Sequence, residues 1–212
     1  MIRTLLIASS LMVMASVLGG CRDGRLVVAL GEPIAVTTAG STGLDIEPAF
    51  PGSRPGLPYM LDFQDFASVT VRMDGVVVLE TGPAQASFSV AASGVVDDVV
   101  INIEATVPAA QRDTLVTGIY RDLLHRGWRY WDGNPPDVVG SISPQRWKRC
   151  LEGYSGGDDY PVPGRGGFFG AVFERSTSRW TAKVHNLFGC RLDGDNENPY
   201  IDRQFDVSLT AP

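Results

Sequence analysis

The sequence has little of what several common functions require. Lysine and arginine number 18 against 24 acidic residues, the formal net charge is -6, and the basic residues form no stripe. Because a protein that binds phosphates gains most of its affinity from clustered Lys and Arg, this distribution argues against nucleic acid as a partner. The chain has three cysteines, Cys21, Cys150 and Cys190, and two histidines. The cysteines lack C-x-x-C spacing and have no histidine at ligand spacing, so we expect no metal site there.

Long apolar runs are also scarce. The apolar run from Leu5 to Val17 is shorter than the about 20 apolar residues that a permanent membrane helix needs. Arg3 precedes this run and small residues follow it, and together these are the three parts of an export signal. We therefore expect residues 1–20 to be a signal peptide.

The end of this segment, Leu18-Gly19-Gly20-Cys21, resembles the lipobox of bacterial lipoproteins. The resemblance implies that Cys21 carries diacylglycerol and becomes the mature N-terminus, with residues 21–25 as a tether. Two or more acyl chains give stable anchoring, at about 0.8 kcal/mol per buried CH₂. In enteric bacteria an Asp directly after the lipidated Cys favours the inner membrane, and Arg22 stands there instead. We expect the periplasmic side of the outer membrane, with the inner membrane as the alternative.

An oxidising compartment changes the meaning of the other two cysteines. With Cys21 acylated, an even pair remains, and it predicts one disulfide between Cys150 and Cys190. The loop that this bond closes has about 40 residues, which corresponds to roughly 4 kcal/mol in the chain-entropy model. The alternative is a catalytic or metal-bound pair.

The mature chain has the composition of a globular domain and the local patterns of strands. Hydrophobic residues make up 44% and charged residues 20% of the chain. Residues 25–30 and 33–38 are short and apolar, while residues 39–58 hold four Gly and four Pro and read as a loop. Asp74-Gly75 lies between two β-branched runs, which predicts a hairpin with a type I′ turn. Residues 86–92 and 95–104 continue the pattern, so we expect a meander.

The C-terminal third again predicts strands. Residues 168–174 and 179–187 can pair across a turn at residues 175–178. Phe205, Val207 and Leu209 alternate with polar residues, as in a strand with one buried side.

One segment predicts a helix, residues 108–126. Pro108 suits the first helical position, and Gly127 can end the helix in the left-handed conformation. Its apolar stripe consists of Leu115, Ile119, Tyr120, Leu123 and Leu124. The predicted fold is therefore α+β, a mostly antiparallel sheet with this helix packed on it. The body spans residues 26–212, and a division into two halves, 26–131 and 132–212, is an open alternative.

Aromatic residues cluster at the end of this helix. Trp128, Tyr130 and Trp131 follow Gly127 directly. Aromatic residues at a helix exit usually cover the end of the helix as part of the core, which is the reading we favour. The alternative is a platform on which a ligand stacks.

One motif resembles a catalytic nucleophile. Residues 153–157 match G-x-S-x-G, with Ser155 as the nucleophile, and Asp158, Asp159 and His185 follow in the order of the α/β-hydrolases. That elbow needs a strand that turns sharply into a helix, whereas the Gly and Pro residues that follow here cannot form a helix. We expect no catalytic role for Ser155. His185 alternates with apolar residues and is expected on a polar, solvated face of a strand.

An acidic stretch near the C-terminus resembles a calcium loop. Asp193, Asp195 and Glu197 fall at its first, third and fifth positions, but Asn198 replaces the turning Gly and Gln204 replaces the last acid. The EF-hand interpretation fails on both counts. A looser calcium site that includes Asp202 is the alternative to a solvated acidic turn. We expect no cofactor and no resident metal.

These features favour binding over catalysis. We expect a lipid-anchored protein that binds another protein, as an inhibitor or immunity factor against an envelope-targeting toxin, or as an assembly accessory. Its layout resembles that of some immunity lipoproteins of bacterial toxin secretion systems. The candidate binding residues are Trp131 and the acidic Asp193, Asp195 and Glu197. Two alternatives remain, an envelope hydrolase that uses Ser155 or an acid pair, and a structural lipoprotein that binds the cell wall.

Overall fold

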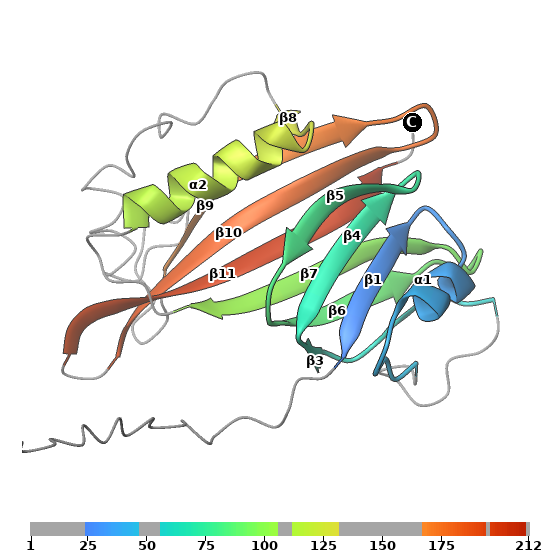
Figure 1. The fold of residues 1–212 in the computed structure, drawn as a ribbon, viewed down its shortest axis with the longest axis horizontal. Coiled ribbons are helices and arrows are strands. Elements are labelled where there is room, and N and C mark those ends of the chain that lie inside the picture. The colour runs from blue at the N-terminus through green and yellow to red at the C-terminus, as the bar shows by residue number, and fades with distance from the viewer. Residues whose placement is uncertain (1–23, 47–55, 106–111, 132–166, 194–195, 211–212) are drawn as a thin grey trace, which may run out of the picture.

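The computed structural model describes residues 24–46, 56–105, 112–131, 167–193 and 196–210 (Figure 1). These residues form a mostly antiparallel α+β fold, as the sequence predicts. The elements in chain order are β1 (Arg25–Leu30), α1 (Ile34–Gly40), β2 (Tyr59–Met60), β3 (Gln64–Phe66), β4 (Ser68–Met73), β5 (Val76–Thr81), β6 (Ala84–Val90), β7 (Val96–Ala105), α2 (Arg112–His125), β8 (Arg129–Tyr130), β9 (Gly167–Ser176), β10 (Thr181–Asp193) and β11 (Asn196–Thr210).

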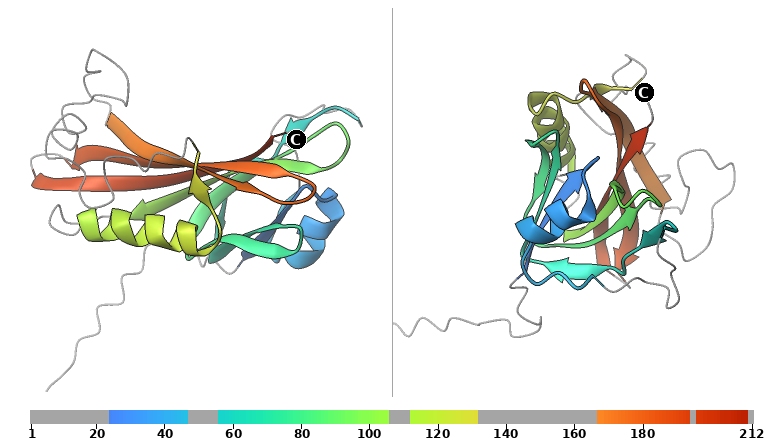
Figure 2. Two further views of the ribbon diagram at one scale, coloured as in Figure 1. Left: turned by 90° about the horizontal axis from the view of Figure 1, so that it is seen from above. Right: turned by 90° about the vertical axis from the view of Figure 1, so that its right-hand side faces the viewer.

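The strands form two sheets. The small sheet has the order β1-β4-β5, and the large sheet has the order β2-β6-β7-β11-β10-β9-β8, with β3 also paired to β6. Strands β1 and β4 are parallel, and the other pairs are antiparallel. Figure 2 shows α2 and the small sheet along one face of the large sheet, which we call the inner face. The buried apolar residues of α2, the small sheet and the large sheet form one core.

The hairpin predicted at Asp74-Gly75 is confirmed. Both residues have positive φ angles, 49° and 76°, as a type I′ turn requires. Val69, Val71 and Met73 of β4 are buried, as the alternation predicts. The expected meander is wrong, however, because the chain leaves the small sheet after β5 and enters the large one at β6. Gly82-Pro83 lies between β5 and β6 and ends the strand pairing of the small sheet. The apolar face of the small sheet then packs against the apolar face of the large sheet.

The strand predicted at residues 33–38 is wrong, because Ile34–Gly40 forms the helix α1. The hydroxyls of this region explain the difference. Backbone N–H groups along the outer edge of β1 donate to side chains rather than to a neighbouring strand, Val27 to Ser41 Oγ at 2.9 Å and Ala29 to Thr37 Oγ1 at 3.0 Å. Thr37 and Ser41 are four residues apart, so the helical turn brings both hydroxyls to this edge of β1. The free edge of the small sheet is thereby protected.

Helix α2 packs against the inner face through Val116, Ile119, Tyr120 and Leu123. Gly127 has a φ of 84°, which is the left-handed conformation expected after the helix. The sequence places Leu124 in the buried stripe, but the structure leaves it 41% exposed, and Val116, about two turns earlier, is buried instead. Among the described residues, no helix has the length and apolar character that crossing a membrane requires.

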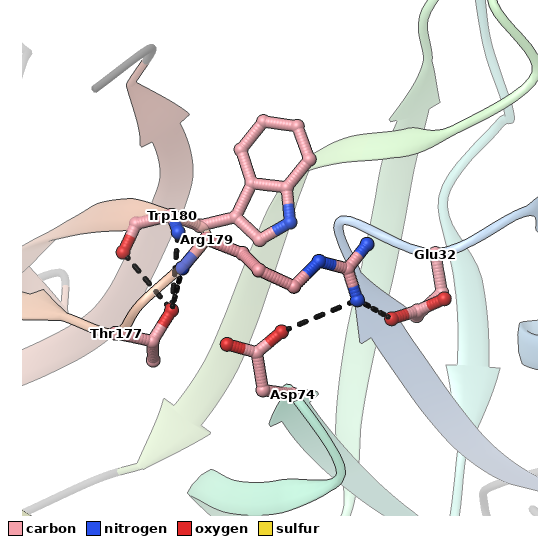
Figure 3. Close-up of polar contacts among 5 residues, drawn as sticks. All are labelled: Glu32, Asp74, Thr177, Arg179 and Trp180. Atoms are coloured by element: carbon pink, nitrogen blue, oxygen red, sulfur yellow. Dashed lines mark hydrogen bonds and ion pairs between the residues drawn. The ribbon is translucent and has the colours of Figure 1, made fainter.

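Side chains of the turn between β9 and β10, in the large sheet, contact residues of the small sheet (Figure 3). Arg179 Nη1 lies 2.8 Å from Glu32 Oε1, after β1, and 3.5 Å from Asp74 Oδ1, in the β4–β5 turn. Thr177 orders the turn, because its Oγ1 accepts the backbone N–H of Trp180 at 3.1 Å. The Trp180 side chain then packs against Gly31.

The C-terminal strands pair as the sequence predicts. β9 and β10 are antiparallel, and the turn lies at residues 177–180, slightly later than expected. Phe205 and Val207 of β11 are fully buried. Strand β11 also pairs with β7, so the large sheet takes strands from both halves of the chain.

Candidate functional site

The face of the large sheet turned away from the core is polar. Along its strands the side chains alternate, and the buried ones point to α2 and the small sheet. The strand register aligns a row of the opposite side chains across five strands: Asp98, Ser208, Lys183, Glu174 and Arg129. A second row beside it holds Val100, Asp206, His185 and Val172. We call the surface formed by these two rows and Trp131 the outer face.

Trp131 is the aromatic residue of this face. It follows β8, and its backbone N–H donates to the carbonyl of Val172 at 3.2 Å. Lys183 Nζ lies 4.2 Å from the centroid of its ring, within cation–π range, yet the residue is 53% exposed. Its backbone and its ring are therefore both held, while about half of its surface is free to contact another molecule.

The other two aromatic residues of this cluster belong to the interior. Trp128 is buried, and its Nε1 donates to the carbonyl of Val78 in β5 at 2.7 Å. Tyr130 stacks on Phe173 with ring centroids 4.7 Å apart, and burial raises the pKa of its phenol. Core packing, the favoured reading, is therefore correct for Trp128 and Tyr130. Trp131 has instead the exposure that the platform reading requires.

Charge pairs order the row beside Trp131. Arg129 Nε lies 3.0 Å from Glu174 Oε1, and Glu174 is the cross-strand neighbour of Lys183. The Arg129 side chain is largely exposed, so this pair sets the charge pattern more than it stabilises the fold.

Two carboxyl groups meet at the other end of the outer face. Asp98 of β7 and Asp206 of β11 lie on neighbouring strands and share a hydrogen bond between their side chains. Burial, followed by the charge and hydrogen bond of Asp206 and the charge of Asp97, raises the pKa of Asp98 to about 7. The Asp98 carboxyl, whose pKa is about 7, therefore changes its protonation state near neutral pH.

His185 lies on the polar face, as predicted. It is half-buried, its sequence neighbours Val184 and Asn186 are buried on the opposite face, and its cross-strand neighbour in β11 is Asp206. Within the described part of the chain, no group of three or more His, Cys, Asp or Glu residues is placed to hold a metal ion.

The structure separates the two predicted binding elements. Trp131 lies beside the start of β10, whereas Asp193 ends this strand and pairs across the next turn with Asn196. About ten residues of extended strand, on the order of 30 Å, separate them. Glu197 lies in β11, and Asp195 lies outside the described residues. A single small contact cannot use both elements.

Several other predicted residues also lie outside the described ones, namely Cys21, Cys150 and Ser155. For Cys190 the backbone alone is placed, in β10 opposite Gly167 and Ile201. The lipid attachment and the disulfide stay predictions.

Sequence reasoning missed the carboxyl pair. The alternation around Phe205 places Asp206 on a polar face, and the alternation around Val99 does the same for Asp98. What could not be seen is that β7 and β11 are neighbours. No family model, no curated protein and no solved structure matches this chain.

Proposed function

We propose that this protein is a lipid-anchored lipoprotein of the bacterial periplasm whose outer face binds another protein. Its role is that of an inhibitor or immunity factor against an envelope-targeting toxin. Lipid on Cys21 anchors the chain on the periplasmic side of the outer membrane, and the body is the part that binds. The observation that supports this best is Trp131, which is held in place and yet half exposed.

A held, exposed tryptophan suits a protein interface. Tryptophan is among the residues that dominate binding energies, because its large ring desolvates fully in a partner's pocket. A side chain that is already ordered loses less conformational entropy on binding. Lys183 orders the ring from one side and leaves the rest of its surface open.

The charged row next to Trp131 would fix the orientation in which a partner binds. Arg129, Glu174 and Lys183 alternate in sign across neighbouring strands. Charges at the rim of an interface favour one partner and one orientation more than they add affinity. A matching partner presents charges of the opposite sign to each of these three residues, beside a pocket that accepts the Trp131 ring.

The first step of the test is to capture the partner. A photo-crosslinking amino acid at position 131 should form an adduct in cells, and the same amino acid at Leu124 is the matched control. Leu124 is also a large, exposed apolar residue, but it lies on α2. Equal adducts at both positions would argue against the outer face.

The second step is to measure binding with the purified partner. Trp131→Ala should weaken binding by at least about 2 kcal/mol, roughly 30-fold in Kd, as for a hot spot. Leu124→Ala should change the Kd little. Wild-type affinity in a folded Trp131→Ala variant would exclude Trp131 as the anchor of the interface.

A further inference from the structure

Exposed apolar side chains gather at one edge of the molecule. Of the eight large hydrophobic residues that are exposed among the described ones, four lie between residues 46 and 63. They are Ile46, Leu57, Met60 and Phe63. Solvent-exposed apolar residues that stand singly need no explanation, whereas a concentration of them marks a contact surface.

Three of these residues lie in or beside the short edge strands: Met60 ends β2, Phe63 directly precedes β3, and Leu57 lies two residues before β2. Met60 pairs with Ser89 of β6, and Gln64, which follows Phe63, pairs with Ala86. The Gln64 side chain also holds Asp45, the neighbour of Ile46. Its Oε1 accepts the Asp45 N–H at 2.9 Å, and its Nε2 donates to the Asp45 carbonyl at 2.6 Å.

Ile46, Met60 and Phe63 thus lie along one edge of the large sheet, which we call the tether-side edge. Ile46 and Phe63 are 55% and 47% exposed and flank the Gln64–Asp45 contact. Both side chains are large enough to bury substantial apolar area against a second surface.

The described chain begins at this same edge. The backbone N–H of Ala67, next to β3, donates to the carbonyl of Gly24 at 2.7 Å. A Cβ on Gly24 would lie 3.3 Å from the ring of Phe66, three residues after Phe63. Figure 1 shows the start of β1 beside β3.

Chain length then limits the distance to the lipid. Gly24 is the third residue after Cys21, and three fully extended residue steps span at most about 11 Å. Acyl chains on Cys21 insert into the hydrocarbon of the bilayer. The edge that holds Gly24 is therefore kept at the membrane surface, within reach of the interfacial region.

We propose that the tether-side edge is a membrane-contact surface, on which the body rests against the bilayer that holds its anchor. This inference rests on the lipid anchor of the proposed function, and it does not depend on the protein partner. Ile46 and Phe63 insert into the interface, with Met60 beyond them along the sheet. The outer face is then presented from a body with a fixed orientation rather than from a freely rotating one.

The charges at this edge define the kind of bilayer. Asp62 and Asp65 are exposed on the same stretch as Phe63. Carboxylates are repelled by an anionic lipid surface, so the surface suits zwitterionic lipid.

The test uses fluorescence quenching in the full, lipidated chain. Phe63→Trp and, as a second variant, Ile46→Trp are reconstituted into phosphatidylcholine vesicles with and without brominated acyl chains. The control is Val76→Trp. Val76 begins β5, at the end of β4 that lies away from the tether-side edge, and its native side chain is 52% exposed. The fluorescence added by each new tryptophan is read as a difference from the wild-type chain.

Each outcome is decisive. The tryptophan at position 63 or 46 should lose fluorescence in brominated vesicles, while the one at position 76 keeps it. Vesicle-bound protein in which neither position is quenched, or in which position 76 is quenched equally, would overturn the membrane-contact surface and leave the lipid anchor intact. A wild-type chain that is absent from the vesicle fraction would overturn both.

Discussion

Trp180 packs its indole ring against the backbone of Gly31, and no other residue fits there. A Cβ on Gly31 would lie 2.4 Å from Nε1 of the ring, and the φ of Gly31 is +78°. This contact joins the β9–β10 turn to the end of β1, beside the ion pair of Arg179 with Glu32 (Figure 3). The two sheets thus meet through a glycine that is required for two separate reasons.

A comparison of two Gly→Ala variants separates the cost of the positive φ from the cost of the contact with Trp180. Gly31→Ala should lower the free energy of unfolding by about 2 to 4 kcal/mol, because a positive φ costs a residue with a Cβ about 1 to 2 kcal/mol and overpacking adds a similar amount. Gly75→Ala is the matched control, since its φ is +76° and no atom of the described residues lies within 4 Å of an added Cβ. Denaturant titration should show the larger loss for Gly31→Ala. Equal losses would mean that the turn yields to the new methyl group.

The carboxyl pair of Asp98 and Asp206 predicts a pH dependence of stability. The pKa of Asp98 is about 7 in the folded chain, above its ordinary value of 3.8. Between these values the folded state holds a proton that the unfolded state has released, so stability is full below pH 3.8 and falls as the pH rises through 7. Asp98→Asn should remove this slope and raise the melting temperature at pH 8, while the two curves converge near pH 4.

The matched control for this pH profile is Asp62→Asn, which removes a carboxylate from an exposed site. It should leave the slope between pH 4 and pH 7 unchanged. An Asp98→Asn profile parallel to that of the wild type would show that the pKa of Asp98 is not raised in the folded chain.

Asn186 is a buried polar residue whose cost can be measured. It is fully buried in β10 on the inner face, and among the described residues neither its amide nitrogen nor its amide oxygen has a hydrogen-bond partner. Each unpaired buried group costs about 1 to 3 kcal/mol, so Asn186→Leu should increase the free energy of unfolding by about that amount. Ser87→Ala is the contrasting variant, because the Ser87 hydroxyl donates to the carbonyl of Leu61. It should destabilise by about 1 kcal/mol. A loss of stability in Asn186→Leu would show that the amide is paired in solution.

The disulfide prediction has a direct chemical test. If Cys21 carries lipid and Cys150 and Cys190 form a disulfide, as predicted, denatured, non-reduced mature protein should show no free thiol. Reaction with two equivalents of a thiol reagent would show that Cys150 and Cys190 are not joined. Reduction should lower the free energy of unfolding by roughly 4 kcal/mol, the chain-entropy value for a loop of about 40 residues.

Local patterns determined what the sequence could predict. Asp74-Gly75 specifies its turn through two residues, and the alternation in β7 and β11 identifies their buried sides without knowledge of the neighbours. α1 was missed because its β-branched residues favour a strand, whereas the hydroxyls of Thr37 and Ser41 gain partners on β1 when the segment is helical. This advantage exists in the folded protein and has no local signature.

The same limit applies to the candidate site. The sequence singles out Trp131 because it follows the helix exit in a group of three aromatic residues, and its role in binding stays a prediction. Asp98 and Asp206, more than one hundred residues apart, become a pair only through the register of β7 with β11. Strand order in a sheet depends on how all apolar faces are buried together, which no single segment encodes.

The last prediction distinguishes binding from catalysis. Complementation of a deletion strain, at matched expression, compares Ser155→Ala with Trp131→Ala and with charge reversal of Asp193, Asp195 and Glu197. Ser155→Ala should preserve the phenotype, because the Gly and Pro residues that follow Ser155 in the sequence do not predict the helix that a nucleophile elbow requires. Trp131→Ala should abolish the phenotype, and the charge reversal should reduce it only if the partner extends along β10 for roughly 30 Å. Loss of function in Ser155→Ala alone, with a folded protein, would replace the binding function with that of a hydrolase.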